Sequence, residues 1–539
     1  MADDINADVI IVGSGISGAL MGARLAAAGV KVAILEAGPK VDRATAVQNF
    51  WNALIKVPEC AYPSTPEAMH PISNDLDYWY KQVGVDKFQS TYLKVAGGTT
   101  WHWLGTCLRL LPRDFSLKTT YGHGVDWPIA YKDLEPFYGE AEKEIGVSGD
   151  SNEALGAPRS SPYPMPQIPQ TYLDKAYAKA LEGTKYQVRS TPQGRNSANR
   201  ADRPACCGNA SCIPVCPVQA KYDATVHLAQ FEKSGGALHA ETTATFVEVG
   251  DQGVIAGIRF KLRDGSEGRA TGRVYVLAAH AIETPRLLLA SSQPKAPNGV
   301  ANYSDQVGRN LMDHPTQLSW ALSNDPLWPY RGPLSTSGIE NLRDGDFRRD
   351  RPAFRIEIGN DGWSWPTGAP ITTASDLADL GMTGKALDGE LVRVTSRHVR
   401  LASLVEQMPD PENRVTLDSN ARDMYGVPPP QIKYRLDDFT KSGLAAARRA
   451  HDDIFDRLGT TGTTHSPDAQ GAGHIIGTAR MGRDPKTSVV DRTLNCHDHP
   501  NIFILGSTVF PTSATGNPTL TIAALSLRAV AVVKAALHS

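Results

Sequence analysis

The feature that most constrains this chain is a short apolar run near its N-terminus that leads directly into a glycine-rich turn. Residues 8–12 read D-V-I-I-V and residues 13–18 read G-S-G-I-S-G, and an alanine-rich stretch follows them. A β-branched run, then glycines, then strong helix formers predict a strand, a turn and a helix. Gly13 permits the tight turn, Gly15 lets backbone N–H groups approach a pyrophosphate, and Gly18 allows close packing of helix on strand. The pattern indicates the first unit of a dinucleotide-binding domain.

An acidic residue after the next apolar run supports this interpretation. Residues 31–35 form that run and Glu36 ends it, eighteen residues after Gly18. A carboxylate at this place can accept hydrogen bonds from the ribose hydroxyls of an adenosine. The same charge would repel a 2′-phosphate. FAD or NAD is therefore favoured over NADP, although a glycine turn before a helix also occurs without any ligand.

A cysteine-rich run is the second informative feature. Residues 206–217 read C-C-G-N-A-S-C-I-P-V-C-P and hold four of the seven cysteines. The spacing is C-x5-C-x3-C-P from Cys206 or C-x4-C-x3-C-P from Cys207, and short spacings closed by Cys-Pro are typical of iron–sulfur proteins. Zinc is disfavoured because the run has no paired spacing and no nearby His. A pair of disulfides in an exported protein stays open. The other cysteines are expected to be buried, inert thiols: Cys60, Cys107 and Cys496.

Composition and charge bound the remaining possibilities. The chain has 539 residues, of which 41% are hydrophobic and 21% charged, as in an ordinary globular enzyme of two or three domains. A net charge of −2 without long basic runs argues against nucleic acid or an anionic membrane as partner. The acidic first residues lack the pattern of a secretory signal. Residues 520–537 are apolar but carry Arg528 and Lys534, so we expect a core helix and not a membrane span.

Several further motifs occur in a fixed order along the chain. They are G-G-T-T-W-H-W at 97–103, turn-separated strands over 246–279, E-T-P-R-L-L-L at 283–289, V-G-R-N-L-M-D-H-P at 307–315, H-I-I-G-T at 474–478 and G-N-P-T-L-T at 516–521. In this order, and over essentially the full length, the chain resembles the glucose–methanol–choline (GMC) family of FAD oxidoreductases. The resemblance implies an α/β fold, with a Rossmann-like FAD-binding domain (the GMC fold) and a substrate domain that contains an antiparallel sheet.

The resemblance also implies how the domains divide the chain. The FAD-binding domain would be discontinuous and consist of residues 1–160, 220–315 and 466–539. Residues 196–219 would form an iron–sulfur cluster loop, and residues 316–465 would form the substrate domain over the flavin.

The family's chemistry assigns two catalytic residues. GMC enzymes take a hydride from a C–H bond next to a hydroxyl and pass it to the flavin, while a base receives the hydroxyl proton. His474 matches the catalytic histidine of the motif H-x-x-G-T, and Asn517 matches the second residue of the pair. Asn517 before Pro518 also predicts a helix N-cap, whose dipole would favour negative charge on the flavin. Without the motif, His474 could equally be a hydrogen-bonded core histidine and the helix an ordinary capped one.

Cofactor contacts follow from the same resemblance. The expected FAD-binding residues are Gly13, Gly15, Gly18, Glu36, Gly97, Gly98, Thr99, Thr100, His102, Gly506, Asn517 and Thr519. His102 matches the histidine that is joined to the flavin in one member of the family, pyranose 2-oxidase. A covalent flavin and noncovalent packing of Trp101, His102 and Trp103 around its ring both stay open.

The cysteine loop narrows the resemblance to the catalytic subunits of bacterial FAD-dependent sugar dehydrogenases, which carry a [3Fe-4S] cluster. It implies Cys206, Cys212 and Cys216 as the cluster ligands and leaves Cys207 undecided. A cluster carries one electron at a time, so a dehydrogenase that reduces dyes, quinones or a cytochrome is expected. The implied partners are a small chaperone-like subunit with a twin-arginine signal and a multihaem cytochrome c subunit. They imply a periplasmic location at the inner membrane, with the cytoplasm as the alternative.

The substrate is expected to be a small sugar, with D-glucose oxidised at C1 as the first expectation and fructose, gluconate, a polyol or a glycoside left open. Residues 325–395 are expected to line the entrance. Four aromatic residues there could stack on a pyranose face, and a structural role for them is equally open: Trp328, Tyr330, Trp363 and Trp365. Two functions of other classes also remain. One is a lyase with a purely structural FAD, and the other is an electron-transfer subunit without a substrate of its own.

Overall fold

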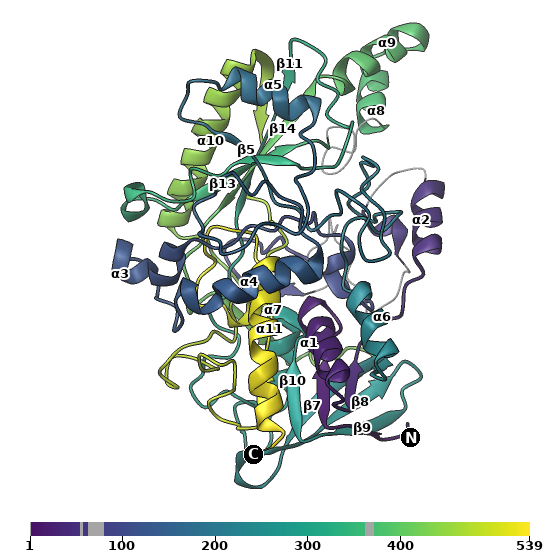
Figure 1. The fold of residues 1–539 in the computed structure, drawn as a ribbon, viewed down its shortest axis with the longest axis vertical. Coiled ribbons are helices and arrows are strands. Elements are labelled where there is room, and N and C mark those ends of the chain that lie inside the picture. Colours follow the sequence, from purple (N-terminus) through teal and green to yellow (C-terminus); the bar gives the residue numbers. More distant parts are fainter. Residues whose placement is uncertain (1, 54–57, 63–79, 362–370, 539) are drawn as a thin grey trace.

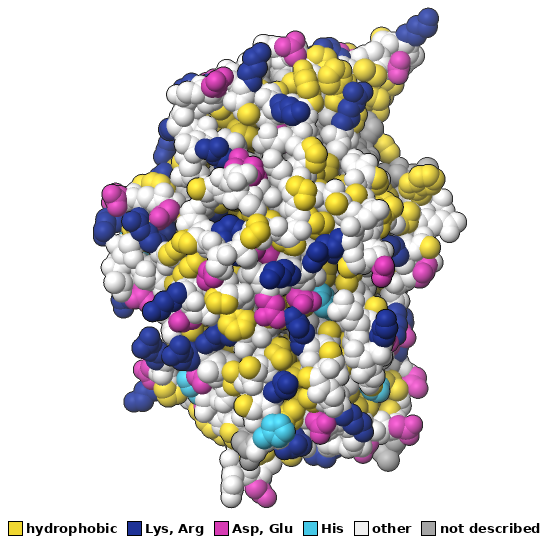
Figure 2. All heavy atoms as spheres, in the orientation of Figure 1, with side chains coloured by type: hydrophobic (Ala, Val, Ile, Leu, Met, Phe, Trp, Pro, Cys, Tyr) yellow, Lys and Arg dark blue, Asp and Glu magenta, His cyan; other side chains and the backbone are white. Residues whose placement is uncertain are grey.

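A computed structural model describes residues 2–53, 58–62, 80–361 and 371–538. Two sheet-containing layers stand one above the other along the long axis, and both chain ends lie in the lower layer (Figure 1). The predicted Trp363 and Trp365 lie outside the described residues. On the face shown in Figure 2, Lys and Arg side chains are interspersed with Asp and Glu, which agrees with the small net charge.

The lower layer is built on a five-stranded parallel sheet in the order β18-β10-β2-β3-β6. Its strands are β2 (Val9–Val12), β3 (Val32–Leu35), β6 (Ala237–His239), β10 (Val274–Leu277) and β18 (Ile502–Ile504). The strands β2, β3, β10 and β18 are buried throughout, as expected for a parallel sheet covered on both faces. The two strands predicted around the glycine turn are confirmed, and the sheet joins segments from both ends and the middle of the chain.

Helices cover this sheet and give it its core. They include α1 (Ile16–Ala27), α4 (Tyr131–Ile145), α6 (Thr225–Lys233), α7 (His280–Ala290) and α11 (Thr519–Ala536). By length and composition alone α11 could cross a membrane, but half of its apolar window is buried. It packs against α4 and α1, which is how a core helix behaves (Figure 1).

A four-stranded sheet in the order β1-β9-β8-β7 flanks the parallel sheet. Its strands are β1 (Ile5–Asn6), β7 (Thr242–Val249), β8 (Ile255–Leu262) and β9 (Glu267–Thr271). The predicted run of turn-separated strands is therefore present. Its last strand, β10, leaves this sheet and enters the parallel one.

The upper layer is a six-stranded sheet in the order β17-β11-β14-β13-β12-β5, with every neighbouring pair antiparallel. Its strands are β5 (Val188–Ser190), β11 (Thr316–Ser323), β12 (Ser337–Ile339), β13 (Phe354–Gly359), β14 (His398–Val405) and β17 (Thr460–His465). Helices α5 (Tyr172–Ala180) and α10 (Asp438–Leu458) pack on it through a shared apolar cluster. The antiparallel sheet is as predicted, but β5 and α5 come from outside the predicted substrate domain, 316–465.

One segment inside that predicted range packs with the lower layer. Strands β15 (Arg414–Leu417) and β16 (Pro430–Lys433) form a three-stranded sheet with β4 (Lys81–Gln82). Val415 and Ile432 share an apolar cluster with Ala281 and Ile282 of α7. This burial holds residues 414–433 against the lower layer, so the substrate layer is not one continuous stretch. The other α-helices in the described part of the chain are α2 (Arg43–Asn52), α3 (Leu117–Tyr121), α8 (Ile371–Asp379) and α9 (Gly384–Thr395).

Candidate active site

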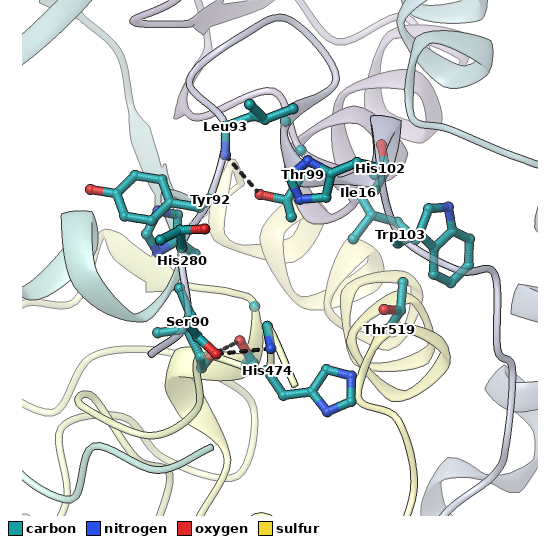
Figure 3. Close-up of a pocket in the computed structure, with 18 of the residues that line it drawn as sticks. Ile16, Ser90, Tyr92, Leu93, Thr99, His102, Trp103, His280, His474 and Thr519 are labelled. Atoms are coloured by element: carbon teal, nitrogen blue, oxygen red, sulfur yellow. Dashed lines mark hydrogen bonds between the residues drawn. The ribbon is translucent and has the colours of Figure 1, made fainter. Parts of the chain in front are cut away.

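A cavity of about 760 Å³ lies between the two layers and takes its walls from both. Most of the predicted site residues line it: Gly13, Gly15, Glu36, Gly98, Thr99, Thr100, His102, His474, Gly506, Asn517 and Thr519. In Figure 3, His474 and His102 project from separate parts of the wall, and Thr519 lies on the helix beside them. The fold therefore gathers residues that are hundreds of positions apart in sequence.

Glu36 is fixed at the carboxyl end of β3, beside the first glycine turn. Its Oε2 accepts hydrogen bonds from the Ser14 N–H at 3.0 Å and the Ser14 hydroxyl at 2.6 Å, and its Oε1 accepts from the Gly38 N–H at 2.9 Å. Burial raises the pKa of this carboxyl. The side chain is thus positioned at the cavity wall where a ribose would be held.

In the first glycine turn, Gly15 has room for a side chain, whereas Gly13 and Gly18 do not. A Cβ on Gly18 would lie 1.9 Å from the Gly13 carbonyl oxygen, so a side chain there is incompatible with the turn. Gly13 adopts a φ of +95°, which favours glycine. A Cβ on Gly15 would meet nothing within 4 Å, because Gly15 faces the cavity. This open approach to backbone at a helix N-terminus is what a pyrophosphate requires.

The second glycine pair lies directly over the first turn. Gly97 has a φ of +95° and donates its N–H to the Ser14 hydroxyl at 3.1 Å. A Cβ on Gly98 would lie 3.3 Å from the Gly15 Cα. Beyond it, the Thr99 hydroxyl accepts from the Leu93 N–H at 3.3 Å (Figure 3). The two glycine turns together leave a backbone-lined channel for a dinucleotide.

His102 is buried in the cavity wall as a neutral imidazole. Burial, with repulsion from Lys221, lowers its pKa to about 3. Its Nδ1 is buried without a hydrogen-bond partner among the described residues. Trp103 lines the cavity next to it, whereas Trp101 packs in an apolar cluster behind the wall. A free ring nitrogen in the wall is compatible with either a bonded or a packed flavin.

His474 is held by a hydrogen-bonded chain that fixes its protons. The Ala514 carbonyl oxygen can only accept, so His314 donates to it through Nε2 at 3.1 Å. Burial lowers the pKa of His314 to about 4, which leaves its Nδ1 unprotonated. That atom accepts from the Nδ1–H of His474 at 3.0 Å. The Nε2 of His474 therefore carries the lone pair that faces the cavity.

Asn517 is hydrogen-bonded to the Nε2 atom of His474. Its Nδ2 donates to His474 Nε2 at 3.3 Å, and its Oδ1 accepts from Arg355 Nη1 at 3.5 Å, which orients the amide. Helix α11 begins at Thr519 after Pro518, and no side chain caps it. The prediction that Asn517 caps this helix is therefore wrong, because its amide is engaged by His474 and Arg355. Burial lowers the pKa of His474 well below its ordinary value, and the neighbouring His314 and the positive charge of Arg355 lower it further.

The cysteine loop lies at another wall of the same cavity. Its residues Ala210, Ile213 and Pro214 line the cavity, while the cysteines themselves lie behind them. The structure describes all seven cysteines and joins none of them in a disulfide; Cys212 is buried, Cys206 and Cys216 are partly buried and Cys207 is exposed. Outside the loop, Cys107 and Cys496 are buried as predicted, but Cys60 is partly exposed.

Each of the three predicted ligand sulfurs receives a hydrogen bond. Arg195 Nη2 lies 3.1 Å from Cys212 Sγ, the Gly208 N–H lies 3.4 Å from Cys206 Sγ, and the Lys221 N–H lies 3.5 Å from Cys216 Sγ. Burial raises the pKa of the Cys206 thiol. Over the described ranges, no group of three or more His, Cys, Asp and Glu side chains is arranged as an assembled metal site.

Buried cations surround this loop. Arg195 and Lys221 are each 1% exposed and Arg203 is 6% exposed. Within the described part of the chain, Arg195 Nη1 and the Nε and Nη1 of Arg203 are buried without an acceptor. Lys221 Nζ donates to the carbonyls of Trp101 and Trp103 at 2.7 Å each, which ties the loop to the backbone that carries His102. Unpaired buried cations are costly, so this region is suited to an anionic group.

Comparison with known proteins identifies the family. Residues 67–316 and 409–526 match the description GMC oxidoreductase, and residues 11–73 match an NAD(P)-binding Rossmann-like domain. The chain belongs to the GMC oxidoreductase family. The predicted family, fold class and FAD cofactor are thereby confirmed for this GMC oxidoreductase.

Relatives of this GMC oxidoreductase span nearly its whole length. The fructose dehydrogenase large subunit of Gluconobacter japonicus is 36% identical over 98% of this chain and 97% of its own. The gluconate 2-dehydrogenase flavoprotein of Pantoea cypripedii is 25% identical over 96% and 92%. A formate oxidase structure superposes with a TM-score of 0.69 at 16% identity, covering 99% of each chain, which supports the fold.

Sequence reasoning missed some residues of this GMC oxidoreductase. His314 and Arg355 act on the catalytic pair, yet only the D-H-P motif marked His314, and no motif marked Arg355. Trp328 and Tyr330 do not line the cavity, which agrees with the structural alternative for them. The Trp328 ring instead packs against Tyr172 at 5.9 Å between centroids.

Proposed function

We propose that this protein is the catalytic subunit of an FAD-dependent sugar dehydrogenase, and that His474 is its base. The observation that carries the proposal is the Nε2 lone pair of a neutral His474, which faces the cavity beside the Asn517 amide. A neutral imidazole of this kind can receive a proton from a substrate hydroxyl. FAD, when bound, supplies the acceptor for the hydride.

The two side chains have complementary roles at one substrate oxygen. Asn517 Nδ2 and His474 Nε2 lie 3.3 Å apart and are hydrogen-bonded to each other. A substrate oxygen placed beside both atoms would replace that bond, accept from an N–H of Asn517 and give its proton to His474 Nε2. Arg355 holds the amide in the orientation that this requires. The wall around Gly15 and Glu36 fits the adenosine and pyrophosphate of FAD, since it offers open backbone and a carboxylate.

A sugar is the proposed substrate class. The most similar relatives include proteins named for fructose and gluconate dehydrogenation, so D-fructose and D-glucose are the first candidates. We rank D-fructose first because the fructose dehydrogenase subunit is 36% identical over almost the full chain. Oxidation of D-glucose at C1, and of a polyol, gluconate or a glycoside, are the alternatives.

Cys206, Cys212 and Cys216 are proposed to hold a [3Fe-4S] cluster as the exit for electrons. With three thiolate ligands the oxidised cluster would be an anion, because its core carries only one positive charge, and it would lie among the buried cations Arg195, Arg203 and Lys221. The unpaired nitrogens of the two arginines support an anionic group at this place. Arg195 Nη2 also donates to the Leu104 carbonyl at 3.1 Å, so the loop is braced against the cavity wall.

Partners and location belong to the same proposal. A small chaperone-like subunit with a twin-arginine signal and a multihaem cytochrome c subunit would take the chain to the periplasmic side of the inner membrane. The relative named as a large subunit supports the existence of partner subunits.

The test is an anaerobic titration of the purified holoenzyme with D-fructose and D-glucose, followed by visible absorption and low-temperature EPR. Bleaching of the flavin with a change in an iron–sulfur signal is expected. Substituting His474→Ala should lower the rate of bleaching about a hundredfold or more, as for loss of a general base. A lyase would show no bleaching, and an electron-transfer subunit would show dye reduction that is unaffected by His474→Ala.

A further inference from the structure

A line of buried charges crosses the cavity roof and ends at the catalytic amide. We call Arg355, Glu357, Asp361 and Arg400 the roof charges. They are between 0% and 5% exposed, and Glu357, Asp361 and Arg400 line the cavity. We infer that the roof charges bind the hydroxyls next to the oxidised carbon and select a neutral, polyhydroxylated substrate. This inference rests on the proposed sugar oxidation.

The strand register brings these side chains to one face. In the antiparallel pair of β13 and β14, Glu357 lies opposite Ala402 and Gly359 lies opposite Arg400. Residues opposite each other in such a pair project from the same face of the sheet. Ala402 and Leu404 line the cavity, so this is the cavity face.

A glycine makes room for the arginine. A Cβ on Gly359 would lie 2.5 Å from Arg400 Nη2. The Arg400 guanidinium can therefore pass over the backbone of β13 at Gly359 and reach the carboxylates of Glu357 and Asp361. Its Nε donates to Asp361 Oδ1 at 2.8 Å, and its Nη2 lies 3.8 Å from Glu357 Oε1.

The line continues to the catalytic pair. Glu357 Oε2 accepts from Arg355 Nη1 at 3.2 Å. The same Nη1 lies 3.5 Å from Asn517 Oδ1. A hydroxyl bound at Glu357 would thus be held at a fixed place relative to the oxygen bound by Asn517 and His474.

The sign of the charge sets the substrate class. Of the roof charges, only Glu357, Asp361 and Arg400 line the cavity. The two carboxylates and one guanidinium that a substrate would meet carry a net charge of −1. A carboxylate substrate would be repelled, whereas sugar hydroxyls can donate to Glu357 and Asp361. A buried ion-pair network of this kind is weak evidence for stability, which favours a role in recognition.

The test compares neutral and anionic substrates in conservative variants of the holoenzyme. Glu357→Gln and Asp361→Asn should raise the KM for the accepted sugar about tenfold, with kcat changed less than about threefold. Both should raise the kcat/KM of D-gluconate relative to that sugar, because each removes a negative charge. Glu412→Gln, which removes an exposed carboxylate outside the cavity, is the matched control and should change neither the KM nor the kcat/KM ratio.

Failure of this inference can be separated from failure of the proposed function. If wild-type enzyme oxidises no sugar, the proposed function is wrong. If it oxidises a sugar but both variants keep its KM and the ratio to D-gluconate, the inference on the roof charges is overturned. Should a variant lose its FAD, a series of deoxy sugars on wild-type enzyme decides. Loss of about tenfold or more in kcat/KM for at least one analogue supports the inference, and uniform values overturn it.

Discussion

The Nδ1 atoms of His474 and His314 lie 3.0 Å apart, and the Ala514 carbonyl bonded to His314 determines which of them carries the proton. Asp313 fixes the backbone of both residues, since its Oδ1 accepts from the N–H of His314 at 2.7 Å and of His474 at 3.1 Å. The tautomer of the base His474 is therefore set by His314, which itself does not line the cavity.

Removal of His314 should impair the base without impairing binding. We expect His314→Leu to lower the rate of flavin reduction by about ten- to a hundredfold, with KM little changed, because His474 can then adopt either tautomer. His314→Gln should recover part of the rate, since its amide can both donate and accept. Rapid-mixing kinetics at several pH values measure this. Equal losses in both variants, or a loss in KM alone, would contradict the assigned role.

The pH dependence should reflect the depressed pKa of His474. The ordinary value for histidine is 6.5, and burial lowers the pKa of His474 well below it. The base is lost when the imidazole gains a proton, so kcat/KM should stay level as the pH falls through 6.5 and decline only at more acid pH. Steady-state assays with the accepted sugar and an artificial acceptor measure the profile. An acid limb centred at or above 6.5 would show that His474 is not the base in this state.

Two glycines of one turn should respond differently to alanine. Gly15 has an extended backbone and open space at its Cβ, so Gly15→Ala should fold normally but bind FAD more weakly, since the methyl group enters the channel. Gly18→Ala should lower stability, because its Cβ would lie 1.9 Å from the Gly13 carbonyl. Thermal unfolding and FAD content after purification check both. Equal thermal stability of the two variants would contradict this view of the turn.

The cysteine loop offers a matched control of its own. Serine at Cys206, Cys212 or Cys216 should abolish bound iron, whereas serine at the exposed Cys207 should leave it unchanged. Iron analysis and EPR of purified protein are the measurements, and neither depends on turnover. Iron that is unaffected in all four variants would remove the proposed cluster from this loop.

A buried ion triad joins the two layers, and removal of its one cation should destabilise the fold. Arg348 Nη2 lies 3.0 Å from Asp114 Oδ1 and 2.6 Å from Glu406 Oε1, and each side chain is at most 1% exposed. Arg348→Met leaves two buried carboxylates unpaired, so the free energy of unfolding should fall by about 3–5 kcal/mol. Because burial raises the pKa of Glu406, the loss should shrink as the pH falls and the carboxyl is protonated.

The control for this triad is Arg393→Met, which removes an exposed pair with Glu390. It should change the free energy of unfolding by less than about 1 kcal/mol. Chemical denaturation at two pH values measures both variants. A cost for Arg348→Met no larger than that of the control would show that the triad does not hold the layers together.

The sequence predicted the parts of the fold that rest on local chemistry. The strand, glycine turn and helix around Gly13, Gly15 and Gly18 follow from backbone requirements, and they are present as predicted. The parallel and antiparallel sheets were expected from the family. Long-range packing was not, since nothing local shows that β5 joins the upper sheet or that β15 and β16 pack on α7.

In the site, too, residues in local motifs were predicted and residues that act through long-range contacts were not. His474 and Asn517 were identified because they lie in recognisable motifs. His314 and Arg355 were not identified, because their roles depend on contacts between residues far apart in sequence. His314 lies 160 residues before His474, and Arg355 lies 162 residues before Asn517. For the aromatic residues near the entrance, the sequence left a sugar-stacking role and a structural role open, and Trp328 packs against Tyr172.

The chain passes several times between the two layers, and this limits how the enzyme can change its substrate preference. The upper sheet draws strands from residues 188–190 through 460–465, and the segment 414–433 returns to the lower layer in between. No single cut in the backbone releases the roof from the cofactor-binding half, so the roof cannot be exchanged as a cassette. We therefore expect selectivity to change through individual substitutions at roof positions, on β13, on β14 and at Asp361, while the rest of the scaffold stays in place.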